Sequence, residues 1–151
     1  MVKLRVLNYE FFTITSSNGM FETVGANLIL EDGRVFTLYN IPRFIAMECL
    51  RLINGYTNDY RRSISEVLSE FPELEKAVSS SIEFIVIDQF DREREVYSAT
   101  IKRKGDNQHI KMIPSHAILL SLISGSNMYV DEKLVEEQER NSQKEYYASR
   151  R

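Results

Sequence analysis

An Ile-Pro dipeptide joins strand-like segments to a helix-like segment at two places in the sequence, and we call each of these places a joint. Ile41-Pro42 and Ile113-Pro114 each follow a group of strand-like segments, and each precedes apolar residues at helical spacing. Proline is favoured at the first position of a helix, because its missing N–H would have no partner there. The repeated order of segments around these joints constrains the fold more than any other feature. It predicts two pseudo-repeated units within the 151 residues.

The segments before the first joint have the composition of β-strands. They are rich in aromatic and β-branched residues, which favour strands. The turns between them contain Asn18-Gly19 and Asp32-Gly33, dipeptides typical of tight hairpin turns. The chain up to Pro42 is therefore predicted to form a three-stranded meander, with strands at residues 8–15, 26–30 and 34–41.

Two helices are predicted after Pro42. Apolar residues at helical spacing from Ile45 to Ile53 predict the first, and Gly55 would end it. Ser63 and Glu66 have the spacing of a capping box at the start of the second. The second helix carries one apolar stripe, the pattern of a helix with one face toward a core. That stripe consists of Ile64, Val67, Leu68 and Phe71.

The second half repeats this order. Residues 82–87 form a nearly continuous apolar run, which predicts a strand covered on both faces or near the sheet centre. Strands at 96–102 and 108–113 would follow, then a helix from Pro114 to Ser124, and a short edge strand at 128–130. The predicted class is α+β, with two β-β-β-α-α units and helices packed on a mostly antiparallel sheet. Residues 1–136 are predicted to form one domain, and the charged tail 137–151 to be helical or disordered.

Composition excludes several classes of protein. The net charge of −3 gives no overall attraction for nucleic acid, so such a ligand would need a local basic patch. No apolar run approaches the roughly 20 residues of a membrane span, and no signal peptide is recognisable, so a cytoplasmic protein is expected. Cys49 is the single cysteine, which excludes an intramolecular disulfide. With only His109 and His116 as histidines, no zinc site is predicted.

Polar chemistry is concentrated at Ser115 and His116, at the start of the second-half helix. Free backbone N–H groups at a helix start favour bound anions such as phosphate. The positive end of the helix dipole would also keep His116 neutral, as a general base requires. Ser115 would help to bind a phosphate oxygen. In the alternative interpretation, Ser115 caps the helix and His116 lies at the surface or at an interface between subunits.

Other residues would contact a nucleic acid. Phosphate groups are bound by local patches of Lys and Arg, and exposed aromatic rings can stack on bases. The acids between residues 88 and 95 fall in one hairpin connection, and no metal ligands are assigned. The candidates for substrate binding are Arg43, Lys102, Arg103 and Lys111, and the candidates for stacking are Tyr39, Tyr56, Tyr60 and Tyr97.

Several short motifs resemble the C-terminal half of the bifunctional nuclease domain family. These motifs are Val96–Thr100 (VYSAT), Ile113–Ile118 (IPSHAI), Gly125, Met128–Val130 (MYV) and Leu134–Glu136 (LVE). The resemblance covers residues 96–136 most clearly, and the joint at 34–52 more loosely. It implies a small α+β domain that forms homo-oligomers and cleaves RNA or DNA, with a divalent cation such as Mg²⁺ as the natural cofactor for that chemistry.

This chain departs from the family pattern at three charged positions. Ile113 replaces the family's Arg before the proline, and His116 replaces its Asp after the serine. Phe44 stands where the family has a Glu, and only Glu48, one turn further on, would substitute for it. Two hypotheses follow. One is a nuclease that uses His116 and Ser115; the other is a non-catalytic, oligomeric binding or scaffold protein that has lost the charged positions.

An oligomer is also predicted from the second-half helix. Its residues from Ala117 to Ile123 are apolar around most of the circumference. Such a helix must be covered on more than one side, and a partner subunit would be a natural cover.

Overall fold

The computed structural model describes residues 1–55 and 61–149. In these ranges the chain forms a mixed α+β fold with one seven-stranded sheet and five helices. The first half contains β1 (Lys3–Thr15), β2 (Glu22–Leu30), β3 (Val35–Ile41), α1 (Arg43–Asn54), α2 (Ile64–Ser69) and α3 (Pro72–Ser81). The second half contains β4 (Ile82–Asp91), β5 (Val96–Arg103), β6 (His109–Met112), α4 (Pro114–Ser124), β7 (Met128–Asp131) and α5 (Glu132–Ser149).

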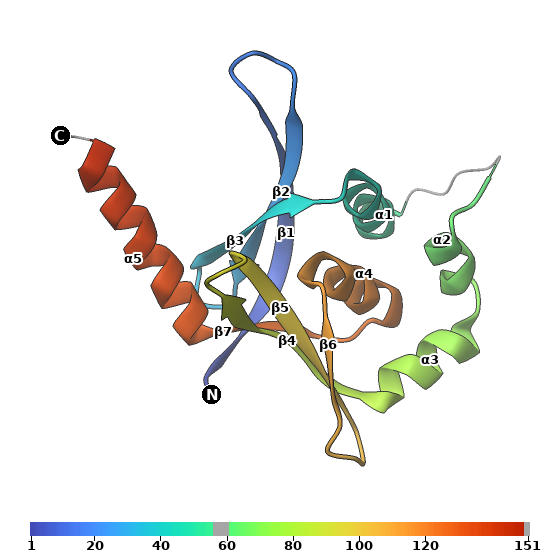
Figure 1. Ribbon diagram of the computed structural model, residues 1–151. Helices are drawn as coiled ribbons and strands as arrows, with labels where there is room; N and C mark the ends of the chain where they lie inside the picture. Colours follow the sequence, from blue (N-terminus) through green and yellow to red (C-terminus); the bar gives the residue numbers. More distant parts are fainter. Residues whose placement is uncertain (56–60, 150–151) are drawn as a thin grey trace.

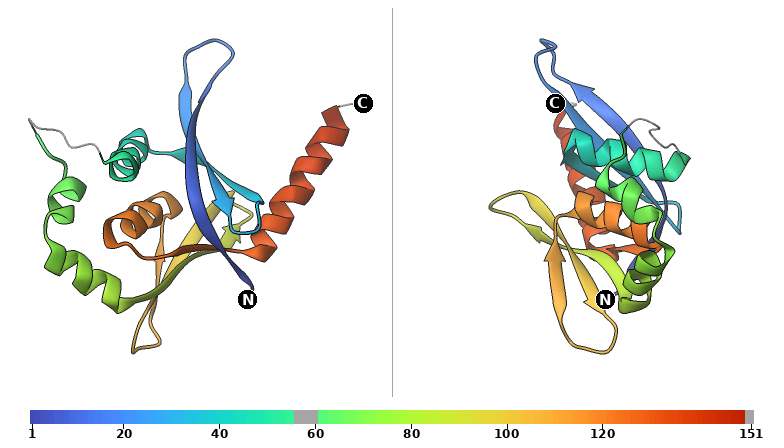
Figure 2. Two further views of the ribbon diagram at one scale, coloured as in Figure 1. Left: turned by 180° about the vertical axis from the view of Figure 1, so that it is seen from behind. Right: turned by 90° about the vertical axis from the view of Figure 1, so that its right-hand side faces the viewer.

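The sheet has the order β3-β2-β1-β7-β4-β5-β6. Neighbouring strands are antiparallel except β4 and β7, which run parallel. Helices α1 to α4 lie on one side of the sheet, and α5 lies on the other (Figures 1 and 2). The predicted α+β class and the mostly antiparallel sheet are confirmed.

The predicted three-stranded meander of the first half is confirmed. Gly19 and Gly33 lie in its two turns with φ angles of 72° and 88°, which glycine adopts without steric cost. β1 begins earlier than predicted because its first residues, Lys3 to Arg5, pair with β7; its pairing with β2 starts at Val6 and has a bulge between Val6 and Asn8.

Strand β7 corrects one prediction. Residues 128–130 were expected to form an edge strand, but β7 lies between β1 and β4 at the centre of the sheet. Met128 and Val130 are accordingly only 2% and 0% exposed. β7 also separates α4 from α5, so the second half does not repeat the helix-helix order of the first. The internal duplication stays a prediction.

Both joints lead into helices as predicted. α1 starts directly after Pro42 and α4 starts at Pro114, and each ends at a left-handed glycine, Gly55 or Gly125. The predicted N-cap of α2 is also confirmed, since the Ser63 hydroxyl accepts a hydrogen bond from the Glu66 backbone N–H at 3.3 Å.

The apolar stripe of α2 does not face the core. Ile64 and Phe71 are 74% and 53% exposed, whereas the polar residues Ser65 and Glu66 are buried. The expectation of an inward apolar face is therefore wrong for this helix. The Glu66 carboxylate lies 3.1 Å from Arg51 on α1, and this polar contact sets which face of α2 turns inward.

Helix α4 is covered by its own chain. It packs against α1, α2, α3 and strands β4 and β5, with Ala117 and Ile118 fully buried in the common core. A partner subunit is therefore not required to cover it. The tail beyond residue 136 is helical as far as Ser149. None of the described helices is long and apolar enough to span a membrane.

Candidate functional site

The two proline joints meet at one cleft. Ile41 and Pro42 line it from the first half, and Ile113 and Pro114 line it from the second. We call this hollow the joint cleft; its volume is about 270 Å³. The other residues that line it are Leu38, Tyr39, Asn40, Glu95, Val96, Tyr97, Ser115 and His116.

The backbone around the joint cleft is strained. In the described part of the chain, Asn40 and Glu95 are the only non-glycine residues with positive φ, at 56° and 55°. Both line the joint cleft, one on each side. Such conformations cost about 1–3 kcal/mol and are concentrated at functional sites. Asn tolerates this region better than most residues, whereas Glu has no such preference.

Two helices begin at the joint cleft. Neither α1 nor α4 has a side-chain N-cap among the described residues, and neither has an acid in its first turn. The alternative interpretation in which Ser115 caps α4 is wrong, because the N-cap residue is Ile113 and Ser115 lies within the helix. Free first-turn N–H groups and the positive end of each helix dipole both favour an anion at this place.

Ser115 is a buried residue with a free hydroxyl. The residue is only 5% exposed, and its hydroxyl has no hydrogen-bond partner among residues 1–55 and 61–149. Every fully buried side-chain oxygen in those ranges has a hydrogen-bond partner. Because the Ser115 hydroxyl has none, it must keep some exposure, and Ser115 lines the cleft. Because the hydroxyl has no protein partner and reaches the cleft, it is available to a ligand there. His116, next to it, is half-buried.

Two tyrosines form walls of the joint cleft. Tyr39 is 61% exposed, and its ring lies edge-on to Phe12 with the centroids 6.3 Å apart. Tyr97 is half-buried against Phe36 at 4.9 Å. Burial raises the pKa of Tyr97, and a hydrogen bond from Gln138 partly offsets that rise. Tyr56 and Tyr60, the other two stacking candidates, lie outside the described residues.

The predicted basic residues do not gather at the joint cleft. Arg43 lines an adjacent hollow that shares Asn40, Ile41 and Pro42 with the cleft, and its guanidinium lies 3.9 Å from Glu22. Lys111 lines a different hollow beside Asp91 and Val96.

Lys102 and Arg103 stand at the far end of β5, away from the cleft residues Val96 and Tyr97 of the same strand. Each has an acidic neighbour. Lys102 lies 3.4 Å from Glu83, and Arg103 lies 3.7 Å from Asp106.

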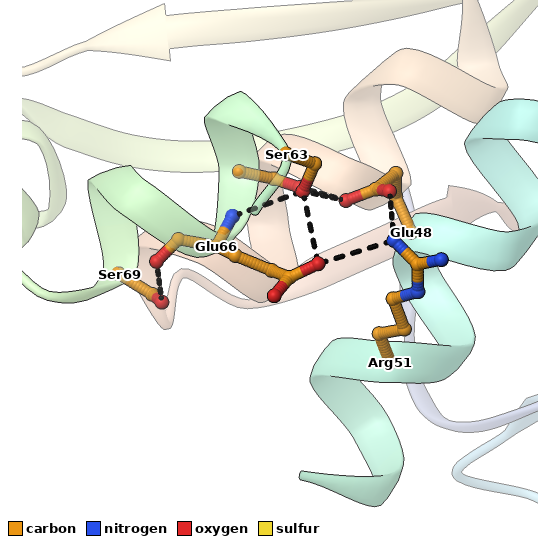
Figure 3. A network of polar contacts seen from close by, with 6 residues as sticks. Glu48, Arg51, Ser63, Glu66 and Ser69 are labelled. Atoms are coloured by element: carbon orange, nitrogen blue, oxygen red, sulfur yellow. Dashed lines mark hydrogen bonds and ion pairs between the residues drawn. The ribbon is translucent and has the colours of Figure 1, made fainter. Parts of the chain in front are cut away.

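Glu48 has a different place from the one that the family pattern suggests. It is 1% exposed and does not line the joint cleft. Its carboxylate accepts hydrogen bonds from Ser63 and Ser65 and forms an ion pair with Arg51 at 3.0 Å. Figure 3 shows Arg51 reaching both the Glu48 and Glu66 carboxylates. We call these residues the buried charge network; it joins α1 to α2.

Sequence reasoning missed this network, although one signal pointed to it. Glu48 stands among apolar residues of an amphipathic helix, where a charged residue requires a partner. Elsewhere, Asp88 accepts a hydrogen bond from Thr100 at 2.8 Å. The described residues contain no group of three or more His, Cys, Asp or Glu side chains placed to hold a metal ion.

No known protein family matches this sequence, and no curated protein is significantly similar to it.

Proposed function

We propose that the joint cleft binds a phosphate group of RNA or DNA. The observation that carries this proposal is the free hydroxyl of the buried residue Ser115, which reaches the cleft at the place where two helices begin. A hydroxyl donor, the first-turn N–H groups and two helix dipoles together favour an anionic oxygen at this position. The resemblance of residues 96–136 to the bifunctional nuclease domain family supports a nucleic acid as the source of that phosphate.

The walls of the joint cleft support a nucleotide rather than a small inorganic anion. Tyr39 and Tyr97 supply aromatic surface, and Pro42, Val96 and Ile113 supply apolar surface. Stacking of a base on an aromatic side chain contributes about 1–3 kcal/mol and depends little on sequence. The preferred ligand is therefore a nucleotide unit of a single strand, with its base against the tyrosines and its phosphate at Ser115.

Binding without hydrolysis is the function that the geometry supports best. Hydrolysis is a second candidate because His116, the only histidine of the joint cleft, lies next to Ser115. As a general base, its imidazole would take a proton from a water molecule that attacks the phosphorus, and the leaving oxygen would be protonated by solvent. No carboxylate set for a metal is assigned, so a role for Mg²⁺ would rest on ligands that the nucleic acid itself supplies.

Binding is tested by titrating the protein into a fluorescently labelled dinucleotide and measuring anisotropy. Ser115→Ala is expected to weaken binding about tenfold, because a hydrogen bond to a charged phosphate contributes about 1.5–3 kcal/mol. Ser79→Ala is the matched control: this serine lies on α3 and bonds to its own helix, to the Lys76 carbonyl at 3.2 Å. Equal affinity of wild type and Ser115→Ala would reject the proposed site.

Hydrolysis is tested separately with labelled RNA and DNA, in Mg²⁺ and in a chelator. A nuclease that uses His116 loses activity in His116→Ala and keeps it in His109→Ala, since His109 lies exposed on β6. Cleavage that both variants retain equally would come from another residue or from a contaminant. Tight binding without any cleavage would reject hydrolysis and support the non-catalytic binding function.

We also infer a homo-oligomer and a cytoplasmic location. The support for an oligomer is the exposed apolar surface of the helices rather than α4. Phe44 and Met47 on α1 are 61% and 45% exposed, and Ile64 on α2 is 74% exposed. Light scattering is expected to give a mass above the 17.6 kDa of one chain. A mass of one chain at micromolar concentration would contradict this inference.

A further inference from the structure

A second hollow lies between α5 and the turn that joins β4 to β5. Its volume is about 360 Å³, and it does not share a residue with the joint cleft. We call it the basic pocket. It is lined by Phe90, Arg92, Glu137, Arg140, Asn141 and Lys144.

The basic pocket collects cations that are not neutralised. Arg92, Arg140 and Lys144 form no ion pair with any residue in the described ranges, although seven other Lys and Arg residues there do. Glu137 is the one acid that lines it. Three positive charges against one negative charge give a local attraction for an anion, in a chain whose net charge is −3.

The pocket residues of α5 share one face of the helix. Glu137, Arg140, Asn141 and Lys144 stand at positions i, i+3, i+4 and i+7, the spacing of neighbours on a helix surface. This face meets Phe90 and Arg92 from the β4–β5 hairpin. The charges therefore converge from two separate elements on one hollow instead of spreading around a solvated helix.

Helix α5 is fixed at the level of the basic pocket. The Gln138 side chain accepts a hydrogen bond from the Thr37 backbone N–H at 2.7 Å and donates one to the Thr37 carbonyl at 2.9 Å. One turn earlier, Val135 is completely buried. Arg140 stands two residues beyond Gln138 on α5, so the helix backbone that carries it is held against β3 before any ligand arrives, which lowers the entropic cost of binding.

An aromatic path connects the basic pocket to the joint cleft. Phe90 lines the basic pocket, and its ring centroid lies 4.6 Å from that of Tyr97, which lines the joint cleft. Glu137 is close enough to Tyr97 to contribute to the rise in the pKa of that phenol, after burial as the main cause. The two hollows are thus linked by two neighbouring rings that are tilted by 40° to one another.

We propose that the basic pocket binds a second phosphate of the same nucleic-acid strand, further along from the phosphate at Ser115. This inference rests on the proposed function of the joint cleft. Cationic grooves combined with aromatic side chains are the usual means of holding a single strand without sequence preference. The strand would run from the joint cleft past Tyr97 and Phe90, with a backbone phosphate between Arg140 and Lys144.

The test compares a labelled dinucleotide, which reaches one site, with a labelled single strand of about 12 nucleotides, which reaches both. The double variant Arg140→Gln, Lys144→Gln is expected to bind the long strand about tenfold more weakly and the dinucleotide as wild type does. The slope of log affinity against log salt for the long strand should become shallower by about 0.7, since one phosphate contact on a single strand contributes about 0.7.

A matched variant controls for net charge. Lys76→Gln, Lys104→Gln also removes two positive charges, from exposed residues that do not line either hollow. An equal loss in this control would mean a general charge effect and would overturn the inference. An unchanged salt slope in the Arg140, Lys144 variant would do the same.

The two proposals fail in different ways. In one outcome, the dinucleotide binds through Ser115 and the Arg140, Lys144 variant binds the long strand as wild type does. That outcome would reject the second site and support the proposed function. If wild type binds neither probe, the proposed function falls and the inference falls with it.

Discussion

α1 and α4 both begin at an Ile-Pro joint, but the residues that follow the two prolines differ in chemistry and in exposure. In α1 the two residues after the proline are Arg43 and Phe44. In α4 they are Ser115 and His116. Arg43 has a side chain that is 76% exposed and Phe44 is 61% exposed, whereas Ser115 is 5% exposed. Both joints border the joint cleft, but of the two residues that follow each proline only those of α4, Ser115 and His116, line it.

The same contrast continues along the two helices. At the sixth position beyond the proline, α1 has the buried acid Glu48 and α4 has the apolar Leu120. At the seventh, α1 has the buried Cys49, and α4 has Ser121, which donates to the Ser126 carbonyl at 2.5 Å. α1 therefore adds the buried charge network to its packing in the core, whereas α4 is held largely by hydrocarbon in the core. Four measurements would break or sharpen this comparison.

The largest effect is expected for Glu48→Ala. Removing this carboxylate leaves Arg51, Ser63 and Ser65 without an acceptor that they share, and breaking a buried pair costs about 3–5 kcal/mol. We expect the free energy of unfolding in urea to fall by about 4 kcal/mol. Glu73→Ala, at an exposed position of α3, should change it by less than about 0.5 kcal/mol. A similarly small effect of Glu48→Ala would show that α1 does not depend on the network.

Ile118→Ala tests the other helix. Ile118 is 1% exposed in the core, and truncation of a buried Ile or Leu to Ala costs about 2–5 kcal/mol. We expect a loss of about 3 kcal/mol by urea denaturation. This loss should not depend on salt, because no charge is removed. A loss that changed strongly with ionic strength would contradict the assignment of α4 to hydrocarbon packing.

Alkaline pH should destabilise the protein through Cys49 on α1. Burial, with a smaller contribution from Glu48, raises the pKa of Cys49 from 9.0 to about 12. The unfolded chain therefore loses this proton at lower pH than the folded protein, so stability falls as pH rises from 9.0 to about 12. The slope for a single group is about 1.4 kcal/mol for each pH unit.

Cys49→Ala provides the comparison for that measurement. Urea denaturation of the variant at pH 9 and pH 10 should show a shallower decrease than wild type. Equal slopes in the two proteins would mean that other groups cause the alkaline destabilisation.

The smallest effect concerns the strained walls of the joint cleft. Glu95→Gly should stabilise the protein by about 0.5–1 kcal/mol, because glycine adopts positive φ without cost. Asn40→Gly should change stability by only a few tenths of a kcal/mol, because Asn already tolerates this conformation. Thermal unfolding of both variants measures the difference. A larger gain at Asn40 than at Glu95 would reverse the comparison.

Local signals in the sequence predicted most elements of the fold. The two Gly-containing turns, the Ser63 cap and both proline joints depend on neighbouring residues, and each was found where it was expected. The place of β7 was not predictable in this way. Its partners, β1 and β4, are distant in sequence, and a short apolar segment has the same appearance at the edge and at the centre of a sheet.

The candidate site was predicted in part. Ser115 and His116 were singled out and do line a cleft, since a helix start is visible in the sequence. Lys102 and Arg103 were grouped with them by charge alone, but they lie at the opposite end of β5 next to acids. The basic pocket was missed because Phe90, Arg92 and Arg140 come from two segments that only the packing of α5 brings together.

The sequence by itself determined where the chain turns, where its helices start and end, and that its strands and helices form one α+β fold, because backbone preferences act over a few residues. Tertiary structure decided which faces of those elements are inside. α2 turns Ser65 and Glu66 inward and leaves Ile64 exposed, against its own apolar pattern. The physical reason is that a buried carboxylate costs more free energy without its partners than an apolar side chain costs in water, so Arg51 and Glu48 fixed the orientation.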